Sequence, residues 1–219
     1  STFKLINGLI ALQEGIIKDN TILKCNNGYE YANDKKVGCH PHKDYVNLLK
    51  SIEISCNTYF CNIYNQYFKK FNSTLQAYDS WYSHVSSFGI GSFMNNDFTI
   101  GNKGKLPKSN YFNTLYRGSW NSNTIISMAI GQGELLMTPI QMANMTAILA
   151  NRGFYYTPHI VKNISEEPFW VSFPCLVIRW PFLSYATPSL FLRMPDCIPP
   201  EPIGTERRPS SPTKTSASL

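Results

Sequence analysis

The first four residues of the chain contain a serine and a lysine at a spacing that suits nucleophilic chemistry. Ser1-Thr2-Phe3-Lys4 has the pattern S-x-x-K, and two helix residues three positions apart lie on one face, within reach of each other. A serine hydroxyl is a weak nucleophile near neutral pH, but a lysine kept neutral by burial can take its proton. The pattern needs partners, because S-x-x-K also arises by chance at exposed helix starts.

Ser55-Cys56-Asn57 supplies a possible partner group. In serine acyl-transferases an S-D-N element follows S-x-x-K and precedes K-T-G, and this chain has Cys56 at the middle position. Ser55 could relay a proton between Lys4 and the leaving amine, while the Asn57 amide could orient Lys4 and bind the substrate's peptide carbonyl. Cys56 is expected to point away. By itself S-x-N is commoner as a helix cap or turn, and that alternative stays open.

A third group of residues has the chemistry of metal ligands. Cys25, Cys39, His40 and His42 fall within 18 residues, and these soft ligands could hold zinc. Their C-x13-C-H-x-H spacing matches no standard zinc site, so a Cys25–Cys39 disulfide in an oxidising compartment or plain loop residues remain alternatives. We therefore predict no metal and no cofactor, and keep these four residues as the candidates should a metal bind.

Two helices are predicted to carry the serine, lysine and asparagine. The apolar positions of residues 3–17 cover most of a helix surface, which is typical of a helix buried in a larger core. Ser1 would lie at the start of this helix. After Ser55, aromatic residues recur every three or four positions as far as Phe71, so this second helix is expected to place an aromatic stripe in the core.

A third helix and several turns are predicted farther along the chain. Thr138-Pro139-Ile140-Gln141 is a capping box with Pro at the first helical position, so the helix should run to about Ala150 before Gly153 stops it. Residues 154–164, which include Pro158, are predicted to form an edge strand or extended segment. Turns are predicted at four further stretches: Asn26–Gly28, Phe88–Gly91, Gly101–Gly104 and Gly131–Gly133.

The composition predicts a globular protein. Of the 219 residues, 43% are hydrophobic and 14% aromatic, which supplies ample apolar surface for a core. The net charge of +6 comes from scattered basic residues, so no nucleic acid partner is expected. No apolar run reaches the roughly 18 residues of a membrane span, so no membrane segment is expected in this chain. Neither an initiating Met nor a signal peptide is visible at Ser1, so we expect this start to be a cut end.

The composition changes abruptly near residue 165. Asn is abundant up to Asn163 and absent afterwards, whereas 10 of the 14 prolines lie between Pro168 and Pro212. We therefore predict two segments, residues 1–164 and a Pro- and Ser-rich tail of residues 165–219 that is disordered or frame-shifted. A natural Pro-rich tail is the alternative, but a frame shift or misjoined coding end explains the loss of Asn as well as the gain of Pro.

The order of the motifs in residues 1–164 resembles class B penicillin-binding proteins. S-x-x-K opens an apolar helix, and S-x-N follows about fifty residues later. Four further stretches fit the same family: Phe88–Gly91, Ala129–Glu134, Thr138–Ala143 and Pro158–Lys162. The chain looks most similar to the elongation-type group, penicillin-binding protein 2. The Gly-Gln-Gly and Thr-Pro-x-Gln stretches are far more specific than either short motif.

The resemblance implies a fold, a reaction and a set of site residues. The fold would be the mixed α/β (α+β) fold of serine transpeptidases and β-lactamases, here incomplete, with a helical subdomain beside a partial antiparallel sheet. Ser1 would be the acylated nucleophile, Lys4 its general base, and Ser55 and Asn57 the second wall of the cleft. Ser1 would attack the penultimate D-alanine carbonyl of a peptidoglycan stem peptide and release terminal D-alanine, and the amine of a neighbouring strand would resolve the acyl-enzyme.

The resemblance also implies ligands, partners and a location. β-Lactams would mimic the acyl donor, and membrane proteins of the cell-elongation machinery would be the partners. The full-length parent would lie at the periplasmic face of the bacterial inner membrane and contribute to cell shape.

The third motif of the family is missing from the chain. No Lys-Thr-Gly or Lys-Ser-Gly triplet occurs, and Lys214-Thr215-Ser216 lacks the glycine. Half of the oxyanion hole would come from that strand, so we expect this fragment itself to be a poor or inactive transpeptidase. Two alternatives stay open, an inactive non-catalytic remnant and a serine β-lactamase-like hydrolase. The hydrolase would lack the Gly-Gln-Gly and Thr-Pro-x-Gln stretches.

Overall fold

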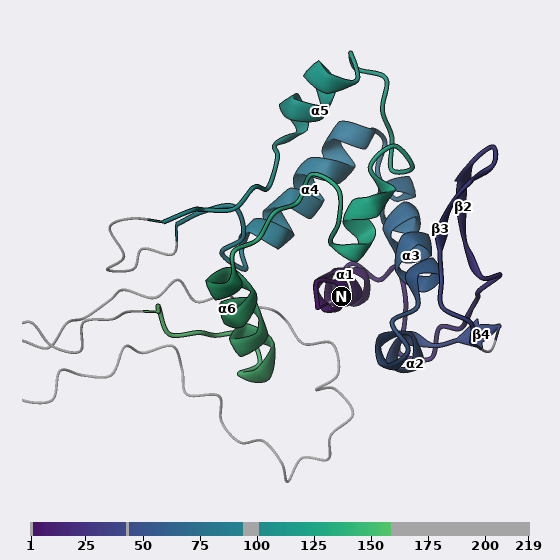
Figure 1. The fold of residues 1–219 in the computed structure, drawn as a ribbon, viewed down its shortest axis with the longest axis horizontal. Coiled ribbons are helices and arrows are strands. Elements are labelled where there is room, and N and C mark those ends of the chain that lie inside the picture. Colours follow the sequence, from purple (N-terminus) through teal and green to yellow (C-terminus); the bar gives the residue numbers. More distant parts are fainter. Residues whose placement is uncertain (1, 43, 94–100, 159–219) are drawn as a thin grey trace, which may run out of the picture. The chain divides into compact units, whose positions relative to one another are not determined.

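A computed structural model describes residues 2–42, 44–93 and 101–158. All of them belong to one compact unit, residues 1–184. The elements follow in the order shown in Figure 1: α1 (Lys4–Gln13), β1 (Leu23–Lys24), β2 (Gly28–Ala32), β3 (Lys35–Gly38), β4 (Tyr45–Val46), α2 (Leu48–Glu53), α3 (Asn57–Lys69), α4 (Thr74–Ser86), α5 (Ser109–Leu115), the 3₁₀ helix η1 (Ile126–Ile130) and α6 (Pro139–Ala150). In the described ranges, no helix has the length and apolarity that crossing a membrane requires.

Helix α3 is the centre of the core. It packs against α1, α4, η1 and the hairpin of β2 and β3, which lies beside it in Figure 1. The predicted aromatic stripe is buried along α3. Tyr64 from this stripe meets the Trp81 ring of α4 edge to face at 5.6 Å between ring centroids, and Phe3 meets the same ring at 6.2 Å. Such pairs add about 0.5–1.5 kcal/mol each to the burial of their apolar area, so α1, α3 and α4 are joined through one tryptophan.

Helix α1 ends earlier than predicted because of a glycine. The prediction extended the helix to residue 17, but α1 ends at Gln13. Gly15 has a φ of +68°, its N–H bonds to the Leu12 carbonyl, and the next N–H, of Ile16, bonds back to the Ala11 carbonyl. This is a Schellman termination, for which a left-handed glycine is the usual residue.

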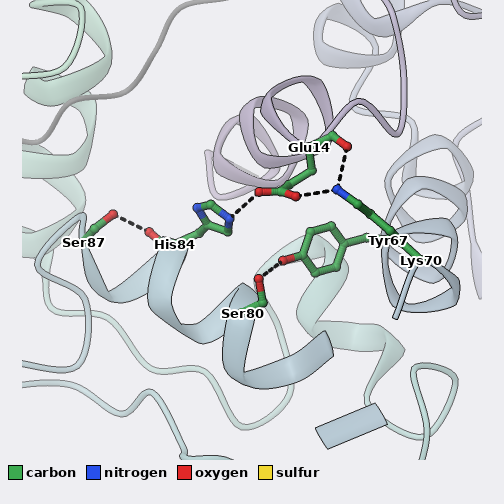
Figure 2. A network of polar contacts seen from close by, with 6 residues as sticks. All are labelled: Glu14, Tyr67, Lys70, Ser80, His84 and Ser87. Atoms are coloured by element: carbon green, nitrogen blue, oxygen red, sulfur yellow. Dashed lines mark hydrogen bonds and ion pairs between the residues drawn. The ribbon is translucent and has the colours of Figure 1, made fainter. Parts of the chain in front are cut away.

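Figure 2 shows a polar network at the end of α1. The Glu14 carboxylate lies 2.7 Å from the Lys70 Nζ and 3.0 Å from the His84 Nε2, so the ends of α1 and α3 are joined to α4. Tyr67 donates a hydrogen bond to Ser80 nearby. Burial raises the pKa of Glu14, but the hydrogen bonds and charges of Lys70 and His84 outweigh burial and lower the pKa overall.

Helix α6 confirms the predicted capping box. The Thr138 hydroxyl accepts from the Gln141 N–H, and the Gln141 side chain accepts from the Thr138 N–H. The helix ends at Ala150 as predicted. The left-handed residue of its termination is Arg152, with a φ of +62°, and the Gly153 N–H bonds back to the Ile148 carbonyl.

The described strands form two small antiparallel sheets, β1 with β4 and β2 with β3. This arrangement confirms the predicted mixture of helix and partial antiparallel sheet. Gly28 was predicted to lie in a turn but begins β2, and the chain reverses instead at Asp34, whose φ is +60°. Residues 154–158 form no strand. The remainder of that predicted segment, and the predicted tail, lie outside the described residues.

Candidate active site

The end of helix α2 positions Ser55. Its N–H bonds to the Ile52 carbonyl at 3.1 Å and the Cys56 N–H bonds to the Ser51 carbonyl at 2.9 Å, which together form a Schellman motif with Ser55 at the left-handed position. Its φ is +56°, where glycine would be unstrained and another residue loses about 1 kcal/mol or more. Serine is therefore less stable than glycine at this position. Its hydroxyl accepts a hydrogen bond from Lys4.

The Lys4 ammonium brings Ser55 and Asn57 together. Its Nζ donates to the Ser55 carbonyl at 2.7 Å, to the Ser55 Oγ at 2.8 Å and to the Asn57 Oδ1 at 2.5 Å. The residue is only 4% exposed, and its Nζ lies 5.7 Å from the centroid of the Phe60 ring. Burial lowers the pKa of Lys4, against the raising effect of nearby cysteines. A lowered pKa increases the neutral fraction, which a general base needs.

Two contacts with strand β3 and the residue after it fix the orientation of Asn57. Its Nδ2 donates to the Gly38 carbonyl at 2.8 Å, and its backbone N–H donates to the Cys39 Sγ at 3.2 Å. Because the amide nitrogen is engaged by Gly38, the amide oxygen faces Lys4. Asn57 is thus held on both sides, and its orientation depends on the segment at Gly38 and Cys39.

The structure therefore joins three of the four predicted catalytic residues, Lys4, Ser55 and Asn57. Ser1 lies outside the described residues, so its role as the nucleophile stays a prediction. The described geometry comprises a buried lysine and the two residues of the predicted second wall. In a serine acyl-transferase this arrangement could accept the nucleophile's proton at Lys4 and pass it through Ser55.

Asn7, one helical turn after Lys4, is a supporting residue that the sequence did not indicate. It is 4% exposed. Its Nδ2 donates to the Ala129 carbonyl at 2.8 Å, and its Oδ1 accepts from the Trp81 Nε1 at 2.8 Å. These bonds fix the rotation of α1 relative to η1, which precedes Gly131. The signal available in the sequence was a polar residue on the otherwise apolar face of a predicted buried helix.

Gln141 has a second role beyond its cap. Its Nε2 lies within 3.2 Å of three backbone carbonyl oxygens, those of Gly89, Ser92 and Lys103, and shares its two hydrogens among them. Two of the predicted glycine-rich turns therefore converge on the start of α6. A Cβ at Gly104 would lie 2.3 Å from the Leu136 carbonyl oxygen, so this close approach requires glycine.

A cluster of sulfur and imidazole donors lies next to Asn57. The side chains of Cys25, Cys39, His42 and Cys56 place their ligand atoms within 4.8 Å of one another. The Cys39 Sγ lies 3.7 Å from the Cys56 Sγ and 3.4 Å from the His42 Nε2. We call these four residues the cysteine cluster.

The electrostatics of the cluster differ from one thiol to the next. Burial raises the pKa of Cys39, but hydrogen bonds from the backbone N–H groups of Thr58 and Asn57 and from the His42 and Cys56 side chains bring it down to about 6. Burial raises the pKa of Cys56 to about 12. Cys39 is therefore the more acidic thiol of the pair.

Two separations within the cluster are close to those of a tetrahedral zinc site. With Zn–S bonds of about 2.3 Å and a Zn–N bond of about 2.05 Å, a tetrahedron has S···S edges of about 3.8 Å and S···N edges of about 3.6 Å. The two separations given above, 3.7 and 3.4 Å, are close to these values. Three thiols and one imidazole are also ligands that zinc prefers, so this cluster could hold the ion.

The predicted candidate ligands need correction at two positions. Among the described residues the cluster contains Cys56 and does not include His40. Cys56 was expected to point away; its sulfur caps the start of α3, accepting from the Tyr59 N–H, and reaches Cys39. Cys25 and Cys39 are free thiols in the structure. The spacing rule failed because the fourth donor comes from a helix start that only the fold brings near.

Two curated relatives are similar in sequence to most of the chain. Peptidoglycan D,D-transpeptidase MrdA of Acinetobacter baumannii is 28% identical to the chain over 179 residues, which are 78% of this chain and 25% of the relative. The protein of the same name from Escherichia coli is 25% identical over 174 residues, 76% of this chain and 25% of the relative. The chain therefore spans about a quarter of the length of these relatives.

Solved structures show the same fold. Pseudomonas aeruginosa PBP2, in complex with WCK 5153, matches with a TM-score of 0.71 and 28% identity, over 83% of this chain and 40% of that chain. Helicobacter pylori PBP2, in complex with MreC, matches with a TM-score of 0.62 over 77% of this chain and 30% of that chain. The second likeness, at 23% identity, shows the fold alone.

A family model covers most of the chain. The model described as the penicillin binding protein transpeptidase domain matches residues 1–184. This match continues beyond residue 164, and the predicted boundary between family domain and tail stays a prediction. The predicted resemblance to elongation-type penicillin-binding proteins is confirmed by the family model, the relatives and the structures together. The chain belongs to the penicillin-binding protein transpeptidase family.

Proposed function

We propose that this chain carries the nucleophile, base and second wall of a peptidoglycan D,D-transpeptidase, which forms an acyl-serine intermediate at Ser1. The observation that carries the proposal is the buried Lys4 ammonium, which donates to both groups of Ser55 and to the Asn57 side chain. A lysine with a lowered pKa, held against a second hydroxyl, is suited to remove a proton from a serine and return it to a leaving amine.

The substrates and partners follow from the family. The acyl donor would be a stem peptide ending in D-alanine, and β-lactams would acylate the same serine. H. pylori PBP2 has been solved in complex with MreC, which supports a partner of that kind in the cell-elongation machinery. We propose the periplasmic face of the inner membrane as the location of the full-length parent.

The test is acylation by a fluorescent penicillin, with the adduct mapped by mass spectrometry. We use the 219-residue chain and a chimera in which a Lys-Thr-Gly segment from an MrdA relative replaces everything after Ile164. The chimera is expected to be labelled at Ser1, and its Ser1→Ala and Lys4→Ala variants are not. The natural chain is expected to label at least a hundredfold more slowly, since one missing oxyanion donor costs about 3 kcal/mol.

Three outcomes would contradict parts of this proposal. A folded chimera that takes no label, or takes it at a residue other than Ser1, would refute the assignment of the nucleophile. Stoichiometric labelling of the natural chain within minutes would refute the role given to the missing motif. Rapid turnover of nitrocefin by the chimera would favour a β-lactamase-like hydrolase, because a transpeptidase retains the acyl group.

A further inference from the structure

We propose that Cys39 and Cys56 are a redox-active thiol pair that reacts with small-molecule or protein disulfides and, when oxidised, releases Asn57 and Lys4 from their active arrangement. The pair is a modification site distinct from the acyl-transfer groups, and its consequence for catalysis rests on the proposed function.

The two sulfurs are close enough to bond after a small movement. They lie 3.7 Å apart, whereas a disulfide bond is about 2.05 Å long. The gap closes if each sulfur moves by less than about 1 Å. Cys25 is the next thiol of the cluster, but its Sγ donates to the Thr58 Oγ1 at 3.0 Å. The geometry therefore favours Cys39 with Cys56 over the pairing of Cys25 with Cys39.

Exposure assigns the roles of the two thiols. Cys39 is partly exposed, whereas Cys56 has no exposed surface. An external disulfide R–S–S–R can therefore reach Cys39 first. The Cys39 thiolate attacks one sulfur, the external S–S bond breaks, and one R–S⁻ leaves. Cys56 then loses its proton, attacks the mixed disulfide at the Cys39 sulfur and displaces the second R–S⁻.

The exchange balances without another reagent. Two protein thiols are oxidised to one disulfide, and R–S–S–R is reduced to two R–SH. The protons of the two protein thiols end on the two leaving thiolates. Cys56 cannot begin the reaction because it is buried, so it acts as the resolving thiol.

Closure of this disulfide changes the surroundings of Asn57. The Cys39 sulfur accepts the Asn57 N–H, and the preceding residue, Gly38, accepts the Asn57 side chain. Bond formation draws that sulfur toward Cys56 and changes its contact with the Asn57 N–H. Cys56 itself stands between Ser55 and Asn57 in the chain. The movement is therefore transmitted to both residues that hold Lys4.

The disulfide and a metal ion would exclude one another. Both need the sulfurs of Cys39 and Cys56, which are two of the four donors in the cysteine cluster. A thiolate bound to metal is shielded from an external disulfide. Zinc is therefore expected to protect the pair, and oxidation is expected to expel zinc.

The first measurement identifies the bond. The full chain is freed of metal with a chelator, treated with oxidised glutathione, and mapped by mass spectrometry without reduction. We expect one disulfide, between Cys39 and Cys56. The Cys56→Ser variant keeps an oxygen acceptor at the start of α3. Its reaction with oxidised glutathione is expected to stop at a glutathione adduct on Cys39. Cys61→Ala, which removes a buried thiol outside the cluster, is the matched control and is expected to form the disulfide normally.

The second measurement reports the release of Lys4 without any β-lactam. The rate at which an amine-reactive ester modifies Lys4 is compared in reduced and oxidised chain, and is expected to rise about tenfold or more on oxidation, as a charged hydrogen bond is lost. Cys56→Ser should show no such rise. Pairing of Cys39 with another cysteine, or an unchanged Lys4 rate after the pair has closed, would overturn the proposal. Failure of Ser1 labelling alone would refute only the proposed function.

Discussion

Replacement of His42 tests whether the metal ligands are those of the cysteine cluster, which contains His42, or those indicated by the sequence spacing, which also include His40. The sequence spacing alone predicted no metal, but the cysteine cluster leads us to expect one bound zinc ion. His42→Ala should weaken that binding. His40→Ala is the matched control, because this neighbouring imidazole is exposed and, in the part of the chain that the structure describes, lies outside the cluster. The two variants remove the same chemical group two residues apart.

The size of the effect follows from the number of ligands. Changing a group that merely orients a metal ligand costs tenfold to a hundredfold in affinity, so the loss of one of four direct ligands should cost at least about a hundredfold, or about 2.7 kcal/mol. Binding also requires deprotonated sulfur. The pKa of Cys39 is already about 6, but that of Cys56 is about 12, so zinc binding is expected to release protons at pH 7.

The assay is competition for zinc against a chromophoric chelator, together with thermal unfolding. Free zinc at a hundred times its dissociation constant should stabilise the wild-type chain by about 2.7 kcal/mol, and a chelator should remove that gain. Equal losses of affinity in His42→Ala and His40→Ala, or wild-type binding in both, would refute the cluster as described.

Three further predictions concern stability, measured by urea unfolding. Glu14→Gln should cost about 1 kcal/mol at pH 7, after allowance for the exposure of Lys70. Because the folded pKa of Glu14 is lowered, this difference is present above the unfolded pKa of about 4.3 and should vanish as the pH falls through the folded value. Its persistence at low pH would contradict us. Gln141→Leu should cost about 3 kcal/mol, since three carbonyls lose their donor, and a cost under about 1 kcal/mol would contradict that role. Ser55→Gly should be about 1 kcal/mol more stable than Ser55→Ala, because glycine relieves the left-handed backbone; equal stabilities would argue against strain at this position.

The sequence predicted α3 and α6 well, but it predicted no helix at α2, α4 or α5. The aromatic period after Ser55 and the capping box at Thr138 both correspond to helices with the expected starts. Helix α1 was predicted too long because Ile16 and Ile17 continue the apolar pattern after Gly15 has already ended the helix. Apolar periodicity identifies a buried face but does not show where the backbone turns away.

Short motifs predicted the residues of the candidate site. They did not predict the contacts that support those residues. Lys4, Ser55 and Asn57 converge as the motifs indicated. Nothing in the sequence indicated that Cys39 would accept the Asn57 N–H, or that Cys56 would join the metal candidates, because both contacts cross between segments that are far apart before folding. Local spacing carries information about one helix or turn, whereas such contacts depend on tertiary packing.

The central claim, that Lys4 is a buried base held by Ser55 and Asn57, is tested most directly by an NMR titration of its side chain. Isotopic labelling of lysine, with Lys4→Arg to assign the resonance, gives the pKa of this amine in the natural chain without substrate. We predict a pKa below the ordinary 10.5 of lysine, because burial disfavours the charged form. A pKa at or above 10.5 would contradict the claim, since Lys4 would then be an ordinary ammonium ion with no advantage as a base.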